Sequence, residues 1–274
     1  MAVLTISRQV GSWGDDIAAM VAEKMDYRLI SRQGISQLAQ ECDPEFKDAC
    51  ALYEREMAEG FRDRVFYREP SYHSLFESLN YELAAQDRVV LVGRGAQIVL
   101  ADLPGVLKVR IVAPTKIRVA RLQESKGISA EEAAKFVRHY DKQRRAMVET
   151  MFDKNLADWS LYDLVVNTTA LSKELARDLI CRGLEEIASH PDWEGLKVDL
   201  ARRSFGKRVE SAIKKEVFTT PFHDIQVTAD AGGNLVLEGQ VQDRMAQGQA
   251  AKIASAYPGV GTVQNNLRTT DLVF

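Results

Sequence analysis

The chain has 274 residues, of which 46% are hydrophobic and 27% charged, and its formal net charge is −3. This composition is typical of a soluble globular protein, and the slightly negative charge argues against a general nucleic-acid-binding surface. The three cysteines lack C-x-x-C spacing and the four histidines are scattered, so neither a metal site nor a disulfide framework is expected.

The start of the chain is apolar, but Arg8 interrupts it, so it is too short for the hydrophobic core of a signal peptide. No apolar run approaches the roughly 20 residues that cross a bilayer. We therefore expect a cytoplasmic protein without a transmembrane segment.

Short apolar segments alternate with helical patterns through the first two thirds of the chain. Val3–Ser7 favours a strand, a glycine-containing turn follows, and apolar residues then recur with helical spacing over Asp15–Met25. Four further segments favour strands: Tyr27–Ile30, Val89–Val92, Leu107–Ala113 and Leu164–Asn167. Helices are expected over 129–152, where Ser129 and Glu132 form a capping-box pattern, and over 172–189.

This alternation predicts an α/β fold with a parallel five-stranded sheet covered by helices on both faces. Asp43–Glu82 departs from the pattern because it is helical, charged and rich in aromatic residues, and we interpret it as a helical insert. Ligands bind such sheets at the carboxyl ends of the strands. The segments 11–14, 93–95 and 167–168 are therefore expected to meet in one crevice.

The pattern changes after the segment His190–Gly195. A basic amphipathic helix is expected over Arg203–Phe218, strands over Ile225–Ala229 and Leu235–Val241, a helix over Asp243–Tyr257 and a strand over Thr262–Arg268. The order αββαβ predicts a small α+β domain over 203–274. A linker over 189–202 is expected to join it to the first domain, residues 1–188.

The glycine turn Ser7–Gly14 between the first strand and the first helix is a candidate phosphate site. A strand–glycine turn–helix unit presents backbone N–H groups at a helix N-terminus, and these groups can hold phosphate. The full Walker pattern has a lysine after its second glycine, whereas Asp15 and Asp16 stand there in this chain. The alternative is a tight turn whose two carboxylates interact with the helix dipole.

Leu4–Ser12 resembles the opening I-T-I-S-R-x-x-G-S-x-G of the cytidylate kinase-like family, a branch of the P-loop nucleoside monophosphate kinases without the Walker lysine. The resemblance extends through the first domain and implies a P-loop kinase-like fold, a nucleotide substrate, and ATP and Mg2+ as cofactors. It also implies that Gly11, Ser12 and Gly14 cradle phosphate and that Arg8 substitutes for the missing lysine.

Two further segments match this family. Arg94 matches the arginine of the segment D-G-R-D that grips the acceptor monophosphate, although Val92 and Gly95 replace the two aspartates. Asn167 and Thr168 match the end of the last strand, which in the family lies near the adenine of the donor.

The family resemblance also implies a lid that supplies charge to the transferring phosphates. Five residues are assigned this catalytic role: Arg118, Arg121, Asp141, Arg144 and Arg145. Phosphoryl transfer is catalysed largely by positioning and charge stabilisation, so converging arginines suit it. Considered alone, the charges on the helix 129–152 favour a solvated face with i,i+4 ion pairs, whereas together with the other matching segments they favour the lid.

Residues 203–272 resemble a BON domain, notably in Gly233–Val241 and Pro258–Val260. Such domains are mostly binding modules, often linked to phospholipid contacts, so the expected partner is a protein or an anionic surface. The basic helix carries the candidate residues Arg202, Arg203, Lys207, Arg208, Lys214 and Lys215. The alternative is again a solvated helix face.

Three hypotheses about function follow. The leading one is an ATP-dependent phosphotransferase acting on a CMP-like nucleotide. The second is a catalytically degenerate nucleotide sensor that signals through its BON-like module, and the absent Walker lysine favours it. The third is a binding adaptor that uses the kinase fold only as a scaffold, and it predicts no affinity for nucleotides.

Overall fold

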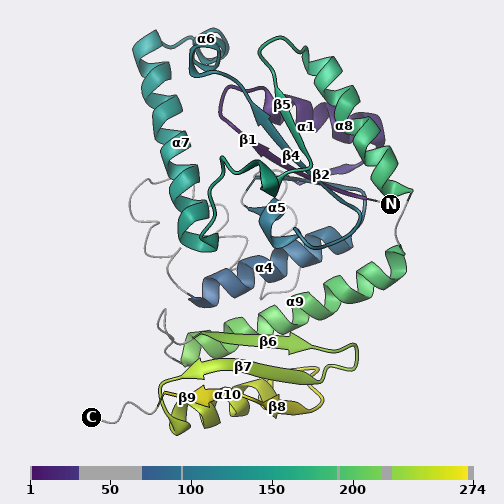
Figure 1. Cartoon of the computed structure of the whole chain (residues 1–274), viewed down its shortest axis with the longest axis vertical. Helices are drawn as coiled ribbons and strands as arrows, with labels where there is room; N and C mark the ends of the chain where they lie inside the picture. Colours follow the sequence, from purple (N-terminus) through teal and green to yellow (C-terminus); the bar gives the residue numbers. More distant parts are fainter. Residues whose placement is uncertain (1, 31–69, 94, 190–191, 218–223, 271–274) are drawn as a thin grey trace. The chain divides into compact units, whose positions relative to one another are not determined.

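The computed structural model describes residues 2–30, 70–93, 95–189, 192–217 and 224–270. These residues form two compact units, coloured along the chain in Figure 1. The first unit holds residues 2–30 and Gln86–Trp193, and the second holds residues 70–85 and 194–270. Each unit has its own sheet and its own hydrophobic core.

The first unit is built on a five-stranded sheet in the order β2-β3-β1-β4-β5, in which every strand pair is parallel. The strands are β1 (Val3–Arg8), β2 (Arg28–Ile30), β3 (Val89–Val92), β4 (Val106–Val112) and β5 (Leu164–Asn167). The predicted α/β architecture and its five-stranded parallel sheet are confirmed.

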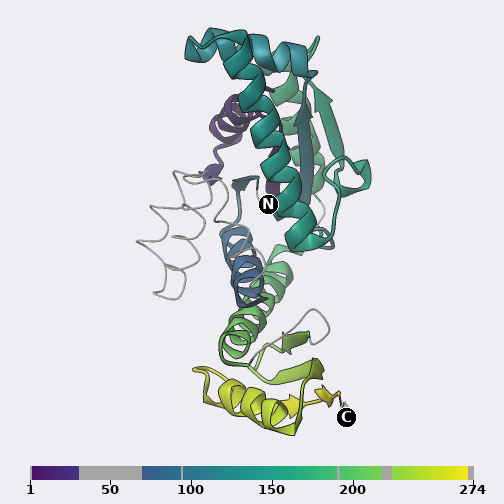
Figure 2. The same ribbon diagram turned by 90° about the vertical axis from the view of Figure 1, so that its left-hand side faces the viewer.

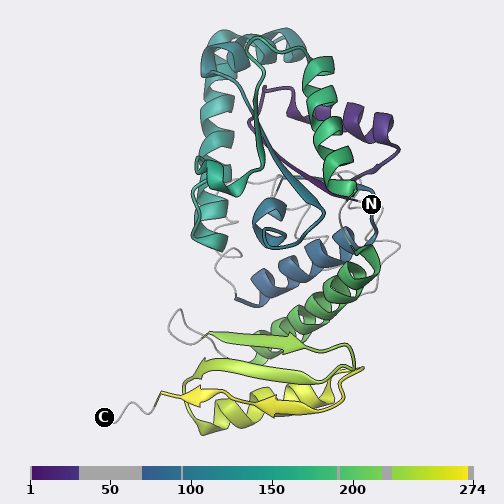
Figure 3. The ribbon, with the colours of Figure 1, turned by 45° about the vertical axis from the view of Figure 1, so that its right-hand side comes forward.

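Helices cover both faces of this sheet. Helices α1 (Gly14–Met25) and α8 (Lys173–Ala188) lie side by side on one face, and α7 (Ala130–Phe152) lies on the other, as Figure 3 shows. Helix α6 (Thr115–Lys126) packs beside α7 (Figure 2). Two short elements escaped prediction, namely α5 (Ala96–Val99) and the 3-10 turn η3 (Trp159–Leu161).

The main core of the first unit lies between the sheet and the α1–α8 layer. Along β4, Leu107, Val109 and Ile111 belong to this core and are at most 4% exposed. Because successive side chains of a strand point to opposite faces, Lys108 and Arg110 lie on the other face of the sheet. A cationic side chain is thus placed on the α7 side of a central strand.

Helix α7 begins at the predicted capping box. The Ser129 hydroxyl accepts a hydrogen bond from the Glu132 N–H at 3.2 Å, and the Glu132 carboxylate accepts one from the Ser129 N–H at 2.9 Å. These hydrogen bonds to Ser129 lower the pKa of Glu132. The reciprocal pair satisfies two N–H groups that a helix start otherwise leaves unpaired.

The second unit combines a small sheet with three helices. Strand β6 (Ile225–Ala229) pairs antiparallel with β7 (Leu235–Val241), and β8 (Val263–Asn265) and β9 (Arg268–Thr269) pair parallel with β7. Its helices are α4 (Pro70–Ala85), α9 (Trp193–Glu216) and α10 (Arg244–Ala256). The predicted C-terminal order αββαβ is confirmed.

Glycine sets the approach of α9 to this sheet. A Cβ atom on Gly206 would lie 2.8 Å from the carbonyl oxygen of Val227, so a larger residue would push the helix away from β6. The close approach lets Ile213 pack with Leu237 and Ala250 in a core where each is fully buried. In the part of the chain that the structure describes, no helix is long and apolar enough to cross a membrane.

Helix α9 occupies part of the segment 189–202 that was expected to be a linker. The expected linker is helical from Trp193 onward, because α9 begins there and Trp193, Leu196 and Leu200 are each at most 7% exposed. Burial of these apolar side chains stabilises turns that Gly195 alone disfavours. Most of the expected helical insert lies outside the described residues, and its last part forms α4 in the second unit.

Candidate phosphate-binding site

The glycine turn after β1 is held in a conformation that depends on glycine. Gly11 has φ +75°, and a Cβ atom there would lie 2.8 Å from the carbonyl oxygen of Arg118 in α6. A Cβ atom on Gly14 would lie 2.4 Å from the Cβ of Arg8. The predicted strand–glycine turn–helix unit therefore exists, and its two glycines allow α6 and the Arg8 side chain to approach the backbone.

Arg8 extends from the end of β1 across this turn. Its Nε donates to Asp15 Oδ1 at 2.8 Å, and its side chain is 18% exposed. Its Nη1 lies 2.3 Å from the point where a Cβ atom on Gly93 would stand, directly after β3. The guanidinium group therefore lies at the carboxyl ends of two neighbouring strands, next to the acidic residue that replaces the Walker lysine.

Two more arginines join Arg8. Arg144 of α7 donates a hydrogen bond to the carbonyl oxygen of Arg8. Arg110 of β4 donates to the hydroxyl of Ser7, and its guanidinium carbon lies 5.7 Å from the centroid of the Tyr162 ring. We call Arg8, Arg110 and Arg144 the arginine cluster. It brings three cations together from β1, β4 and α7.

The pKa values show the electrostatic cost of this arrangement. Burial, followed by the positive charges of Arg8 and Arg110, lowers the pKa of Arg144 to about 9, although Asp15 and Asp141 act in the opposite direction. Burial also lowers the pKa of Arg110. An anion of high charge density would stabilise three cations that are held together with little water, because its hydrogen bonds would replace those that the cations lose to water on burial.

Arg118 and Asp141 have a different role from the arginine cluster. Arg118 is 3% exposed and forms a two-pronged ion pair with Asp141, at 3.1 and 2.8 Å. Its remaining hydrogen bonds go to the carbonyl oxygens of Ala113 and Val10 and to the hydroxyl of Thr115. Since its donors are already engaged, Arg118 connects α6 to α7 and to the glycine turn.

Arg121 closes the other side of the turn. Its guanidinium carbon lies 3.2 Å from the centroid of the Trp13 ring, and its nitrogens donate to the Thr168 hydroxyl at 2.9 Å and the Thr168 carbonyl. Burial lowers its pKa. Trp13 has φ +66°, which is uncommon for a residue other than glycine. Arg121 thus fixes the turn to the loop after β5.

The other predicted site residues are placed as follows. Ser12 is fully buried, and its hydroxyl lies 2.7 Å from the carbonyl oxygen of Gln9, to which it donates. Thr168 is fully buried, whereas Asn167 and Arg145 are exposed. Arg94 lies outside the described residues. Residues at or next to the carboxyl ends of β1, β3, β4 and β5 therefore lie at the same end of the sheet.

Arg110 and Trp13 were absent from the predicted site. Arg110 is flanked by Val109 and Ile111 and follows Lys108 with a spacing of two, and these two cations in an otherwise apolar strand were the available signal. Trp13 stands between two turn residues, and nothing in its spacing indicates that it stacks on Arg121. Among the described residues, no group of three or more His, Cys, Asp or Glu side chains is arranged to hold a metal ion.

The basic side chains of α9 are largely neutralised inside the second unit. Arg202 and Arg203 both pair with Asp199, and Lys207 pairs with Glu77 at 2.7 Å. Lys214 pairs with Asp224 at 3.0 Å. These pairs account for four of the six cations that the sequence indicated for an anionic surface, and they favour a structural role for those four.

Comparison with known proteins identifies the family of each part of the chain. The model of the cytidylate kinase-like family matches residues 3–170, and the model of the BON domain matches residues 206–271. The first unit has a P-loop kinase-like fold. The chain belongs to the cytidylate kinase-like family, and a BON domain follows the family region.

The curated relatives match only parts of the chain. A cytidylate kinase from Pyrococcus horikoshii is 34% identical over 95 residues, which are 34% of this chain and 47% of that protein. A uronate isomerase from Corynebacterium glutamicum is 32% identical over 97 residues, 35% of this chain and 19% of that protein. The chain thus spans less than half the length of either relative.

A solved structure supports the fold. An uncharacterized protein from Eubacterium ventriosum aligns with a TM-score of 0.52 and 19% sequence identity, covering 68% of this chain and 98% of that one. At this identity the likeness concerns the fold alone.

Proposed function

We propose that the arginine cluster binds the phosphate groups of a nucleotide and that the protein is an ATP-dependent phosphotransferase of the nucleoside monophosphate kinase type. The observation that carries the proposal is the convergence of three guanidinium groups at the carboxyl ends of β1, β3 and β4, with the pKa of Arg144 lowered to about 9. Guanidinium groups are suited to phosphate because each can donate two parallel hydrogen bonds.

Each residue has a proposed role in binding the phosphates or in positioning the residues that bind them. Arg8 takes the place of the Walker lysine, and Asp15 orients it through its Nε. Arg144 brings charge from α7 to the phosphates, as a lid residue would. Arg118 and Asp141 position α7, since their ion pair joins α6 and α7. Such fixed charges stabilise the negative charge that develops on the transferring phosphoryl group.

ATP and Mg2+ are proposed from the family, and the residues present fit a phosphate donor. The cations of the proposed anion site are in place, and the lack of a Cβ atom on Gly93, at φ +87°, leaves room for the Arg8 guanidinium group. The Asp15 side chain is 68% exposed, so its carboxylate would be available to a magnesium ion bound to the phosphates. The metal would neutralise phosphate charge.

The acceptor is proposed to be a CMP-like monophosphate held by Arg94. Arg145 would add charge to the lid, and Ser12 and Gly14 would support the phosphate cradle. Asn167, whose side chain is exposed, and Thr168, to which Arg121 donates, would lie near the base of the donor. Because an ATP-dependent kinase needs a pool of nucleotides, we place its action in the cytoplasm.

A specific observation favours a second candidate, a nucleotide sensor without turnover. Asp15 stands where the lysine is expected and binds Arg8 at 2.8 Å, so part of the phosphate-binding charge is already compensated. A site of this kind would hold a nucleotide with less stabilisation of the transition state. In that case the BON domain would report the bound state to a partner.

The test is isothermal titration of the full chain with ATP–magnesium and CMP, separately and together, alongside an assay of ADP release. Binding and ADP release that are both lost in Arg144→Ala, but kept in Arg182→Ala, would support the kinase. Arg182 is a suitable control because its side chain is 79% exposed on α8. Binding without turnover would favour the sensor. No binding of either nucleotide by folded protein would overturn both proposals and leave the adaptor.

A further inference from the structure

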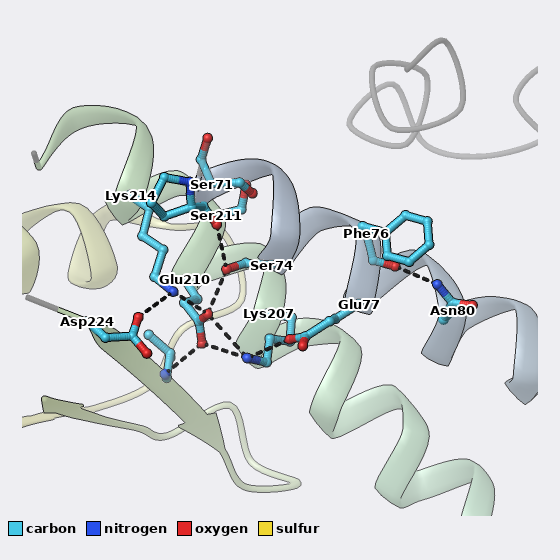
Figure 4. A network of polar contacts seen from close by, with 12 residues as sticks. Ser71, Ser74, Phe76, Glu77, Asn80, Lys207, Glu210, Ser211, Lys214 and Asp224 are labelled. Carbon is cyan, nitrogen blue, oxygen red and sulfur yellow. Dashed lines mark hydrogen bonds and ion pairs between the residues drawn. The ribbon is translucent and has the colours of Figure 1, made fainter. Parts of the chain in front are cut away.

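A polar interface joins α4 to α9 within the second unit. The Ser78 and Ser204 hydroxyls are 3.0 Å apart, and the Ser211 hydroxyl donates to the carbonyl oxygen of Ser71 at 2.8 Å. These four serines are each at most 3% exposed. Because small side chains let two helices approach closely, α4 and α9 pack along a seam of buried hydroxyl groups, which Figure 4 shows in part.

Glu210 is the centre of this interface. It is 1% exposed and accepts hydrogen bonds from the Ser74 hydroxyl at 2.6 Å and from the Val227 N–H at 3.1 Å. Lys214 lies 2.8 Å from its carboxylate, and Lys207 lies 3.1 Å away. Ser74 belongs to α4, both lysines to α9 (Figure 4) and Val227 to β6. One buried carboxylate therefore ties three elements together.

The charges of the network compensate one another. Burial disfavours the charged form of Lys207, but Glu210 and Glu77 outweigh it and raise the pKa of Lys207. A buried carboxylate is tolerated only where its partners surround it, so removing a partner leaves a charge that is costly to bury. α4 contributes Ser74 and Glu77 and is therefore part of what makes the buried Glu210 acceptable.

The chain leaves α4 through a loop with unusual backbone conformation. Asp87 has φ +55° and Arg88 has φ +48°, two consecutive left-handed residues that are not glycine. Such residues are strained and persist where the surrounding structure imposes them. Arg88 is held by an ion pair with Asp26 at 3.1 Å. The next residues form β3, whose carboxyl end is Gly93, beside Arg8.

We propose that α4 couples the C-terminal domain to the nucleotide site. The Glu210 network makes α4 one body with that domain, and the loop 86–88 transmits a change in α4 to β3 and to the turn at Gly93. A ligand of the C-terminal domain would thereby regulate the phosphate site, and a nucleotide would in turn alter the domain. The assignment of Gly93 to a nucleotide site rests on the proposed function, whereas the coupling of α4 to β3 does not.

The test is hydrogen–deuterium exchange of the full chain without nucleotide. Ser74→Ala removes the hydrogen bond from α4 to Glu210 and leaves both lysines in place. We expect amide exchange to rise roughly five-fold in residues 70–85, the factor typical of one lost hydrogen bond, and to rise also in 89–99. The control is Asp224→Asn, which removes the other partner of Lys214 at a 62% exposed site and should leave both segments unchanged.

Glu210→Gln should raise amide exchange in the same two segments by more than Ser74→Ala does. If Glu210→Gln does not fold, the Ser74→Ala result alone tests the coupling. Exchange that rises only in 205–229, or in 70–85 with no change in 89–99, would overturn the coupling.

A second arm adds ATP–magnesium to the wild type. Slower exchange in 89–99 and also in 70–85 would support regulation of the nucleotide site, whereas an effect confined to 89–99 would refute it. Absence of binding would overturn the proposed function, while the exchange results without nucleotide would still decide the coupling.

Discussion

Replacement of Arg144 by methionine tests the electrostatic reasoning about the site most directly. The variant keeps much of the aliphatic volume but removes a cation whose pKa is lowered to about 9 by burial and by Arg8 and Arg110. The ordinary pKa of an arginine side chain is 12.5. The fall from this value to about 9 corresponds to a destabilisation of the folded state of about 5 kcal/mol at most, since each pKa unit is worth about 1.4 kcal/mol. Solvent access and the lost hydrogen bond to the Arg8 carbonyl offset most of this value.

We therefore expect Arg144→Met to be more stable than the wild type by about 1–2 kcal/mol in urea unfolding at pH 7. ATP–magnesium should raise the unfolding midpoint of the wild type but not that of the variant, because the lost cation is the one that an anion compensates. Arg182→Met, on the exposed surface of α8, should match the wild type in both respects.

The dependence on pH has a definite sign. In the folded protein the pKa of Arg144 is lowered, so above about pH 9 the unfolded chain binds more protons than the folded one. Stability contributed by this group therefore rises with pH above about 9, and the advantage of Arg144→Met should narrow there. A variant that is destabilised at pH 7, or an advantage that grows above pH 9, would refute the reasoning.

Three further predictions concern stability. Gly11→Ala should lower the free energy of unfolding by about 2 kcal/mol, because of φ +75° and the carbonyl oxygen 2.8 Å from the new Cβ atom; urea unfolding that is unchanged would contradict this. Asp141→Asn should cost about 2–3 kcal/mol, since it weakens the ion pair that compensates the buried Arg118; thermal unfolding measures it, and Asp163→Asn is an exposed comparison. Ser129→Ala should cost about 1 kcal/mol by removing the α7 cap, an effect that calorimetry would detect and that Ser125→Ala should not reproduce.

The fold could be predicted from the sequence because local patterns largely determine it. The apolar runs that end in Val92 and Asn167 appear as β3 and β5, and the cap at Ser129 begins a helix as its residue types indicate. The opening segment and the C-terminal pattern were sufficient to indicate both families, which the family models confirm.

The site was less predictable because it depends on which side chains meet after folding. Arg118 and Arg144 have the same side chain, yet Arg118 forms an ion pair with Asp141, whereas Arg144 belongs to a cluster of like charges. Arg110 enters that cluster only because β4 lies next to β1 in the sheet, a pairing between residues about a hundred positions apart. The roles assigned to these residues stay predictions until binding is measured.

The limits of α9 also show what the sequence pattern could not reveal. A linker was expected where Trp193 and Leu196 are buried in a helix, because His190–Gly195 has the composition of a turn. Likewise α4 belongs by contact to the second unit although it precedes β3 in the chain. Contacts of this kind depend on tertiary packing, which overrides local preference.

The separation of α4 from α9 has a consequence for synthesis of the protein. Ser78 and Ser204 are 126 residues apart, so a ribosome that adds about 5–20 residues per second exposes α4 for roughly 6–25 s before its partner helix exists. A helix that waited that long with an apolar face would invite aggregation. The serines of α4 that bond to α9 are well solvated by water in the meantime, whereas Leu75, Phe76 and Leu79, which are buried in the folded chain, would be exposed until their partners are made.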